Sequence, residues 1–243
     1  MLELIALEAF LGTAVGWVWN YPVILLCLFG GIFFTVRLGL IQFRCFPHAM
    51  SLVSGKYDNP NEKGQITHFQ ALSAALSGTI GLGNIAGVAI AIGMGGPGSI
   101  LWMWIIGILG MATKYVECSL GTHYREEDSK TGEVRGGPMY YITKGLGKKW
   151  KPLAIFYASM LSLGAFGAGS LFQANQSAEA INYYYGVDHW IIGLILCILG
   201  GLVVLGGIKR IGSVASKIVP AMCFIYVLGA VVICFVNIEK IST

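Results

Sequence analysis

The sequence predicts an all-α membrane protein, and three observations support this fold class. Of the 243 residues, 56% are hydrophobic and 12% are charged, and the mean hydropathy is +0.71. A soluble domain carries roughly 25% charged residues, so this chain has too few charges to cover a surface exposed to water. Its apolar stretches are long and continuous rather than alternating, which favours membrane-spanning helices over the strands of a membrane β-barrel.

Six stretches are long enough to cross the hydrocarbon layer of a bilayer, which takes about 20 helical residues. We expect about six transmembrane helices, at residues 20–40, 68–94, 98–121, 153–181, 189–207 and 214–236. The fourth stretch is long and contains Gly164, Gly167 and Gly169. Because glycine weakens a helix, we expect this span to be tilted or broken.

Two further segments lie outside these spans. Residues 1–18 contain Glu3 and Glu8 but no basic residue, which favours a short interfacial helix over a signal peptide. Residues 122–152 form the longest polar connection, and most of its charges are expected to face water. An amphipathic helix around residues 139–146, resting on the membrane, is a second possibility for part of it.

The distribution of basic residues predicts the orientation, because lysine and arginine mark cytoplasmic loops. They gather after the first span, between the third and fourth, and at the start of the sixth, and they are absent from the connections after the second and fourth spans. We therefore expect a multi-pass protein of the cell membrane with both termini extracytoplasmic. The net charge of +4 requires no nucleic-acid partner.

The most informative stretch is SGTIGLGNIAG at residues 77–87, inside the second expected span. It holds four glycines, each of which costs a helix interior roughly 1 kcal/mol relative to alanine. In hydrocarbon, unpaired backbone groups are tolerated only where protein buries them or where they line a cavity. A broken membrane helix presents N–H groups to anions and freed carbonyls to cations, so this stretch is a candidate binding site.

The glycines also fit two other sequence patterns. The pattern G-x-G-x-x-A at residues 81–86 matches a dinucleotide-binding motif, but no strand precedes it and the next acidic residue is Glu117. The pattern G-x-x-x-G at residues 83–87 also lets two membrane helices pack closely. Packing accounts for two glycines, whereas four glycines with Thr79 and Asn84 among them favour an unwound helix.

Further polar residues occur inside the spans. Gln173 and Asn175 are costly to leave unpaired in lipid, so they should face the interior of the bundle, either in interhelical hydrogen bonds or at a ligand. Lys114 and Glu117 are three residues apart and are expected to pair near the end of the third span. The cysteines and histidines are scattered, which predicts neither a disulfide framework nor a metal site.

Three motifs carry a family resemblance. They are GTIGLGNIAGVAIAIGMGGPGSILWMWIIGILGMATKYVE from residue 78, RGGPMYYI from residue 135 and LFQAN at residues 171–175. With them the chain closely resembles, over essentially its whole length, the sodium:alanine symporters of the alanine or glycine:cation symporter family. One departure is Leu82, where many relatives carry threonine.

The resemblance implies a leucine-transporter-like fold of two inverted five-helix repeats and sodium-coupled uptake of alanine, glycine or a similar small amino acid. Because family members have roughly eleven spans, it also implies that residues 1–243 form one transmembrane domain containing only the first repeat. Residues 1–66 would hold the interfacial helix, the accessory first span and a cytoplasmic loop, and residues 67–243 the repeat. The expected partners are therefore alanine or glycine, the bilayer, and a missing second half or a second copy of the chain.

The predicted break and the resemblance together imply the site residues. Backbone N–H groups of residues 78–83 would receive the carboxylate of the amino acid, and Asn84 with nearby carbonyls would supply oxygen ligands to a co-transported sodium ion. Phe166 and Gly167 would limit the volume of the site. The expected substrate-binding residues are Thr79, Gly81, Gly83, Phe166, Gly167, Gln173 and Asn175, and the expected sodium-binding residues are Asn84 and Ala86.

Two function classes remain open at this point. The first is a sodium-coupled symporter of a small neutral amino acid, present as an incomplete half, and the second is a non-transporting membrane subunit for binding or assembly. An enzyme is not expected, because the sequence has no Gly-x-Ser-x-Gly, His-Glu-x-x-His or phosphate-binding loop motif. Sodium-dependent uptake into vesicles would separate the two classes.

Overall fold

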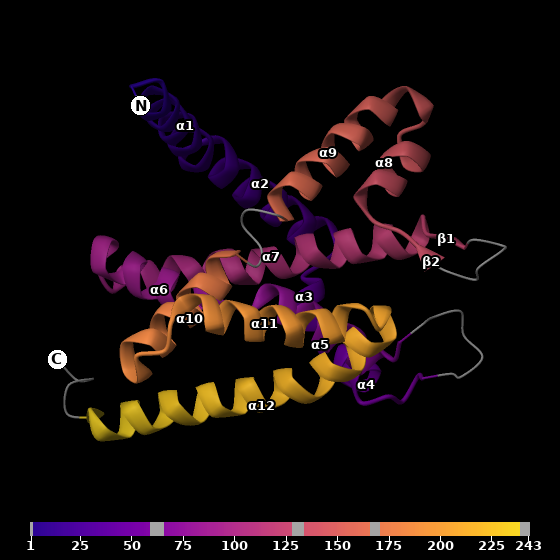
Figure 1. Cartoon of the computed structure of the whole chain (residues 1–243). Helices are drawn as coiled ribbons and strands as arrows, with labels where there is room; N and C mark the ends of the chain where they lie inside the picture. The colour runs from indigo at the N-terminus through magenta and orange to yellow at the C-terminus, as the bar shows by residue number, and fades with distance from the viewer. Residues whose placement is uncertain (1, 59–65, 128–133, 166–170, 239–243) are drawn as a thin grey trace. The chain divides into compact units, whose positions relative to one another are not determined.

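The structure, a computed structural model, describes residues 2–58, 66–127, 134–165 and 171–238 (Figure 1). These residues are almost entirely helical, which confirms the all-α fold class. The chain divides into two compact units, one made of Met1–His48 and Val88–Tyr157 and the other of Ala49–Gly87 and Ala158–Thr243. Each unit therefore joins two stretches that are far apart in the sequence.

Long apolar helices dominate the first unit. Among its helices are α1 (Leu2–Asn20), α2 (Pro22–Arg37), α7 (Gly98–His123) and the short α3 (Ile41–Arg44), and the chain passes into the second unit within α4 (Phe46–Val53). Helix α2 packs along α7 at Gly31, where an added Cβ would lie only 2.8 Å from Cβ of Leu109. Gln42 ties these helices together, because its Nε2 donates to Oγ1 of Thr35 at 2.9 Å and to the carbonyl of Ile108 at 3.2 Å.

The N-terminal segment is a long apolar stretch of helix. Residues Ala6–Arg37 form one apolar helical run of 32 residues, long enough to cross a membrane. Helices α1 and α2 meet at Tyr21 within this run, and the interfacial placement of residues 1–18 stays a prediction. Pro22 does not bend the run sharply because it stands at the start of α2, where the missing N–H costs no helical hydrogen bond.

The polar connection after α7 contains ordered structure. It comprises β1 (Glu126–Glu127), β2 (Val134–Arg135), α8 (Pro138–Gly145) and the 3₁₀ helix η1 (Lys148–Trp150). The strands are antiparallel, with Glu126 opposite Arg135, and α8 packs on α7. An ion pair of 2.9 Å joins Lys144 to Glu126. The helix expected around residues 139–146 is thus confirmed, whereas the short hairpin was not predicted.

The second unit is built around α5 and α12. Its helices are α5 (His68–Thr79), α10 (Leu171–Tyr185), α11 (His189–Val204) and α12 (Gly207–Val236), and α11 contacts both α10 and α12. Helix α5 packs along α12 through small side chains, since Ser73, Gly212 and Ala215 are all buried. A Cβ added at Gly212 would lie 3.2 Å from Cγ2 of Ile66, so only glycine fits this approach without a shift.

The described helices agree in part with the expected spans. Three stretches are long and apolar enough to cross a membrane, namely Ala6–Arg37, Gly98–His123 and Gly207–Val236. Helix α5 and α6 (Leu82–Gly95) form a bent pair that makes a fourth, whereas α11 has only 16 residues. The fourth expected span, at residues 153–181, overlaps two helices, α9 (Lys151–Gly164) and α10. Residues 166–170 between them lie outside the described part. The count of six spans and the repeat architecture stay predictions.

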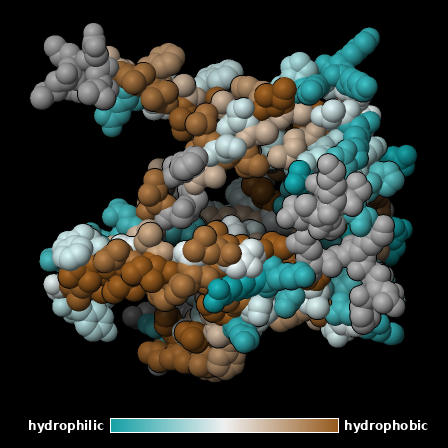
Figure 2. Space-filling view, turned by 45° about the vertical axis from the view of Figure 1, so that its right-hand side comes forward, coloured by the Kyte–Doolittle hydropathy of each residue, from teal (hydrophilic) through white to brown (hydrophobic). Residues whose placement is uncertain are grey.

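The surface is rich in large hydrophobic side chains, which cover much of the face shown in Figure 2. On α12, Phe224 and Ile225 are each 68% exposed. Buried hydrophobic residues are mostly small, such as Ala112, Ala154 and Ala178. Small residues at helix contacts and large apolar residues facing outward are typical of a protein whose solvent is lipid.

Candidate substrate and sodium site

The glycine-rich stretch breaks its helix where the sequence predicts. Helix α5 ends at Thr79 and α6 begins at Leu82, and the two are bent by 43°. Between them Ile80 has an extended backbone, with φ −86° and ψ 107°. The expected interruption inside the second span is therefore confirmed.

The break leaves backbone groups available on both sides. The Ile80 N–H donates to the carbonyl of Leu76 at 2.7 Å, and the Asn84 N–H donates to the carbonyl of Gly81 at 3.0 Å. A helix end otherwise leaves its last carbonyls and its first N–H groups without helical partners. The end of α5 therefore presents partial negative charge, and the start of α6, including Gly83, presents partial positive charge.

A cavity of about 640 Å³ in the second unit adjoins this break. Three parts of the unit enclose it: the α5–α6 junction, α10 and α12. Its lining residues are Ser77, Ile80, Gly81, Asn84, Ile85, Gln173, Ser177, Met222, Cys223, Tyr226 and Val227. Ligand pockets of this kind are mostly apolar with a few polar groups that orient the ligand.

The polar atoms of the cavity are neutral. A Cβ added at Gly81 would lie 2.9 Å from Nε2 of Gln173, so this amide of α10 lies directly against the break. The hydroxyl of Ser77 donates to the Ala74 carbonyl at 2.7 Å, and that of Ser177 donates to the Gln173 carbonyl at 2.8 Å. Because both protons are engaged within the helices, these oxygens offer lone pairs to the cavity, which suits a cation.

The cavity unites only some of the residues expected from the sequence. Gly81, Asn84 and Gln173 line it. Four others do not, namely Thr79, Gly83, Ala86 and Asn175, and Phe166 and Gly167 lie outside the described residues.

Two of those four side chains have clear placements. Thr79 donates its hydroxyl to the Ala75 carbonyl at 2.7 Å. The side chain of Asn175 is exposed, as is that of Gln173, and the position expected for Asn175 in the bundle interior stays a prediction.

The residues of α12 that line the cavity were not predicted from the sequence. Met222, Cys223, Tyr226 and Val227 gave no sequence signal, because apolar and aromatic residues occur throughout the last expected span. Ser77 and Ser177 could have been found, since each is a hydroxyl residue one helical turn or less from a residue already singled out. Among the described residues, no three His, Cys, Asp or Glu side chains gather as a metal site, so a cation here would meet neutral oxygen ligands.

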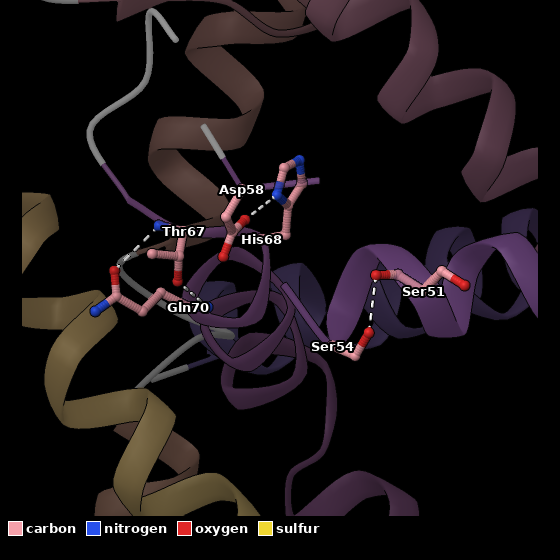
Figure 3. A network of polar contacts seen from close by, with 6 residues as sticks. All are labelled: Ser51, Ser54, Asp58, Thr67, His68 and Gln70. Atoms are coloured by element: carbon pink, nitrogen blue, oxygen red, sulfur yellow. Dashed lines mark hydrogen bonds and ion pairs between the residues drawn. The ribbon is translucent and has the colours of Figure 1, made fainter. Parts of the chain in front are cut away.

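The first residues of α5 are held by a polar network (Figure 3). Thr67 and Gln70 form a capping box, with Thr67 Oγ1 accepting from the Gln70 N–H and Gln70 Oε1 accepting from the Thr67 N–H. The Nδ1–H of His68 donates to the carboxylate of Asp58, and this hydrogen bond lowers the pKa of Asp58. The network fixes the start of the helix that ends at the cavity.

Comparison with known proteins places the chain among transporters. The model of the sodium:alanine symporter family matches residues 4–243. A sodium/alanine symporter of Methanococcus maripaludis is 45% identical over 94% of this chain and 51% of its own length. A transporter of Haemophilus influenzae is 42% identical over 97% of this chain and 51% of its own length. A probable sodium/glutamine symporter of Bacillus subtilis is 36% identical over 97% of this chain and 48% of its own length. The chain thus spans about half the length of the curated relatives that it matches.

Proposed function

The chain belongs to the sodium:alanine symporter family, and we propose that it forms part of a symporter that couples sodium to the uptake of alanine or glycine. The observation that carries this proposal is the broken helix α5–α6 beside a cavity lined by Gly81, Asn84 and Gln173. An amino acid brings an anionic carboxylate and sodium is a hard cation, and the two ends of the break offer the complementary partial charges.

Each end of the break has a proposed role. The N–H groups at the start of α6, around Gly81 and Gly83, bind the carboxylate. The Asn84 side-chain oxygen, the freed carbonyls at the end of α5 and the Ser77 hydroxyl oxygen supply ligands to sodium, which prefers oxygen. Gln173 approaches Gly81 from α10 and orients the substrate beside the break.

The site is proposed to need a second half. The relatives have about as much additional sequence as this chain covers, and a repeat-built transporter forms its site where two repeats meet. The completed transporter is therefore this chain joined to the remaining half of the Methanococcus maripaludis symporter, its 45% identical relative.

The test is binding of labelled alanine to the completed transporter across a sodium titration. Asn84→Ala should shift the sodium dependence to higher concentration by about tenfold, the loss expected for one good ligand. Asn175→Ala is the matched control, because it removes the same amide from an exposed position that does not line the cavity. Glycine and glutamine, added as competitors, define the preferred substrate.

Two outcomes would count against the proposal. Equal sodium dependence in Asn84→Ala and in the unaltered protein would remove this residue from the sodium site. Sodium-independent alanine binding would favour a non-transporting binding subunit. The 243-residue chain alone should accumulate little alanine in vesicles, and strong uptake would show that the second half is dispensable.

We also propose that the basic loops are cytoplasmic and both termini extracytoplasmic, because lysine and arginine concentrate on one side of the expected spans. In a cysteine-free background, Ser129→Cys should resist an impermeant thiol reagent applied outside intact cells. Tyr185→Cys, at the last residue of α10, which is 80% exposed, should react. The reverse labelling pattern would invert the orientation.

A further inference from the structure

A compact basic segment precedes helix α9. Lys148, Lys149 and Trp150 form η1, and Lys151 begins α9 immediately afterwards. All four side chains are exposed, with Trp150 50% exposed. The adjoining Leu146 is 59% exposed, so apolar and basic side chains are interleaved over this short stretch.

The charge of this basic segment is not neutralised within the described part of the chain. Lys144 is paired with Glu126, but no described acidic side chain pairs with Lys148, Lys149 or Lys151. The sequence has no aspartate or glutamate between Glu133 and Glu179. The start of α9 adds the partial positive charge of a helix N-terminus, which is unfavourable beside lysines. An anion from outside this part of the chain would relieve that repulsion.

The basic segment sits on a rigid support. Helix α8 packs on α7 and contacts η1. Gly145, at the end of α8, is so close to Tyr124 that an added Cβ would lie 3.3 Å from its ring. Gly147 then turns the chain with φ +95°, a conformation that favours glycine. The lysines are therefore presented from a supported turn, which lowers the entropy lost when they bind.

The apolar surface of α9 indicates which class of anion lies near the basic segment. Helix α9 carries large apolar side chains toward the outside, with Ile155 57% and Phe156 61% exposed. Because residues 153–181 are one of the expected spans, we expect acyl chains around the later turns of α9 and headgroups at its first turn. Tryptophan concentrates at this level, and lysine ammonium groups reach the phosphates there.

We propose that Lys148, Lys149 and Lys151 bind the headgroup phosphate of an anionic phospholipid, with Trp150 at the boundary between headgroups and acyl chains. Basic clusters next to a membrane helix attract anionic lipids, and lysine is an effective point-charge ligand of phosphate. This site is in the first unit and is separate in sequence from the residues of the proposed transport site.

The experiment uses the full chain in phosphatidylcholine vesicles that contain a minor fraction of either brominated phosphatidylglycerol or brominated phosphatidylcholine. Bromine quenches nearby tryptophan, and the difference between the unaltered chain and Trp150→Phe isolates the signal of Trp150. We expect phosphatidylglycerol to quench Trp150 at least about twofold more than phosphatidylcholine, and high salt to remove this preference.

Matched variants identify the ligands. K148Q/K149Q/K151Q should abolish the preference, and K148R/K149R/K151R should retain it. K209Q/R210Q/K217Q removes the same number of positive charges from another basic cluster and should leave the preference unchanged. If the glutamine variant does not insert, the arginine variant and the salt dependence of the unaltered chain decide the question.

Three results would overturn the proposal. One is equal quenching of Trp150 by the two lipids in the unaltered chain. Another is an equal loss of preference in K209Q/R210Q/K217Q, which would reveal attraction by net charge alone. The third is displacement of the lipid by inorganic phosphate but not by chloride at equal ionic strength, which would identify free phosphate as the ligand.

Discussion

Two packed segments of the second unit both contain residues that weaken a helix, yet only one of them is broken. Helix α12 runs without interruption over Gly207–Val236 although Pro220 lies inside it. The α5–α6 segment contains no proline and opens at Ile80 and Gly81. Since proline costs a helix interior about 3 kcal/mol and glycine about 1 kcal/mol, the strongest single helix breaker did not decide where the break occurs.

The surroundings of the two segments explain this difference. Pro220 lacks one N–H, but α12 continues as a helix on both sides of it. This helix packs against α5, and its residues Gly212, Ala215 and Val219 are buried. Opening α12 toward lipid would expose further backbone groups that hydrocarbon cannot satisfy. The α5–α6 junction at Ile80 and Gly81 instead adjoins a cavity with polar side chains. A membrane helix therefore breaks where a polar cavity can satisfy the hydrogen-bonding groups of the freed backbone.

Disrupting the contact between the two segments should have the largest effect. Ser73 of α5 is 2% exposed, so Ser73→Leu adds volume to a contact that has no room for it. We expect the free energy of unfolding to fall by about 1–3 kcal/mol, as for other overpacked sites. Denaturation of the chain in micelles measures this, with Ser162→Leu at an exposed position as the control. Equal stability of both variants would show that α5 and α12 are not held by close packing.

Closing the break should have the next largest effect. Gly81→Ala raises helix propensity by about 1 kcal/mol and places Cβ against Nε2 of Gln173. We expect alanine binding by the completed transporter to weaken about tenfold, or about 1.4 kcal/mol. Spin labels at Phe69 and Ile90 should move farther apart as the segment straightens.

Two variants separate the causes of that effect. Gly87→Ala is the control, because Gly87 lies inside α6, has no proposed role in binding, and an added Cβ there meets nothing within 4 Å. Adding Gln173→Ala to Gly81→Ala relieves the steric contact and leaves only the change in helix propensity. An unchanged label distance in all three variants would mean that Gly81 does not set the bend.

Removing the proline should have a smaller effect of opposite sign. Pro220→Ala restores an N–H donor to a helix that is already continuous. Because neighbouring groups in a membrane helix offset part of the cost of proline, we expect the free energy of unfolding to rise by only about 1 kcal/mol. Thermal unfolding followed by circular dichroism measures the change. Ala221→Ser, at the next position, serves as the control. A loss of stability in Pro220→Ala would assign the proline a packing role that outweighs its missing hydrogen bond.

The smallest effect is expected at the start of α5. Because the hydrogen bond from His68 lowers the pKa of Asp58, folding favours the ionised carboxylate. Its contribution to stability is complete above about pH 4, the ordinary value, and is lost as the pH falls through the lowered pKa. Asp58→Asn should slightly lower the free energy of unfolding at pH 7. Below about pH 4, the free energy of unfolding of this variant should fall less steeply than that of the unaltered chain. Asp188→Asn is the control, since Asp188 makes no capping hydrogen bond. If the free energy of unfolding of Asp58→Asn and of the unaltered chain fell identically with decreasing pH, the hydrogen bond from His68 to Asp58 would make no contribution to stability.

Composition and glycine content were enough to predict that this protein lies in lipid and where its main helix break occurs. With 56% hydrophobic and only 12% charged residues, the chain cannot have a surface that faces water throughout, and four glycines within ten residues locate the break to within a few positions. Both properties are local, because they depend on composition and on the conformational cost of each residue. The motifs that reveal the family are local in the same sense.

Which residues share the cavity depends on the packing of helices that are distant in the sequence. Gln173 lies against Gly81 although more than ninety positions separate them, and Asn175, two residues further on, is directed elsewhere by the turn of α10. The α12 wall of Met222, Cys223 and Tyr226 could not be predicted, since an apolar residue facing a cavity is indistinguishable in sequence from one facing lipid. Helix packing makes that distinction, because the face that a residue presents depends on how helices distant in the sequence are brought together.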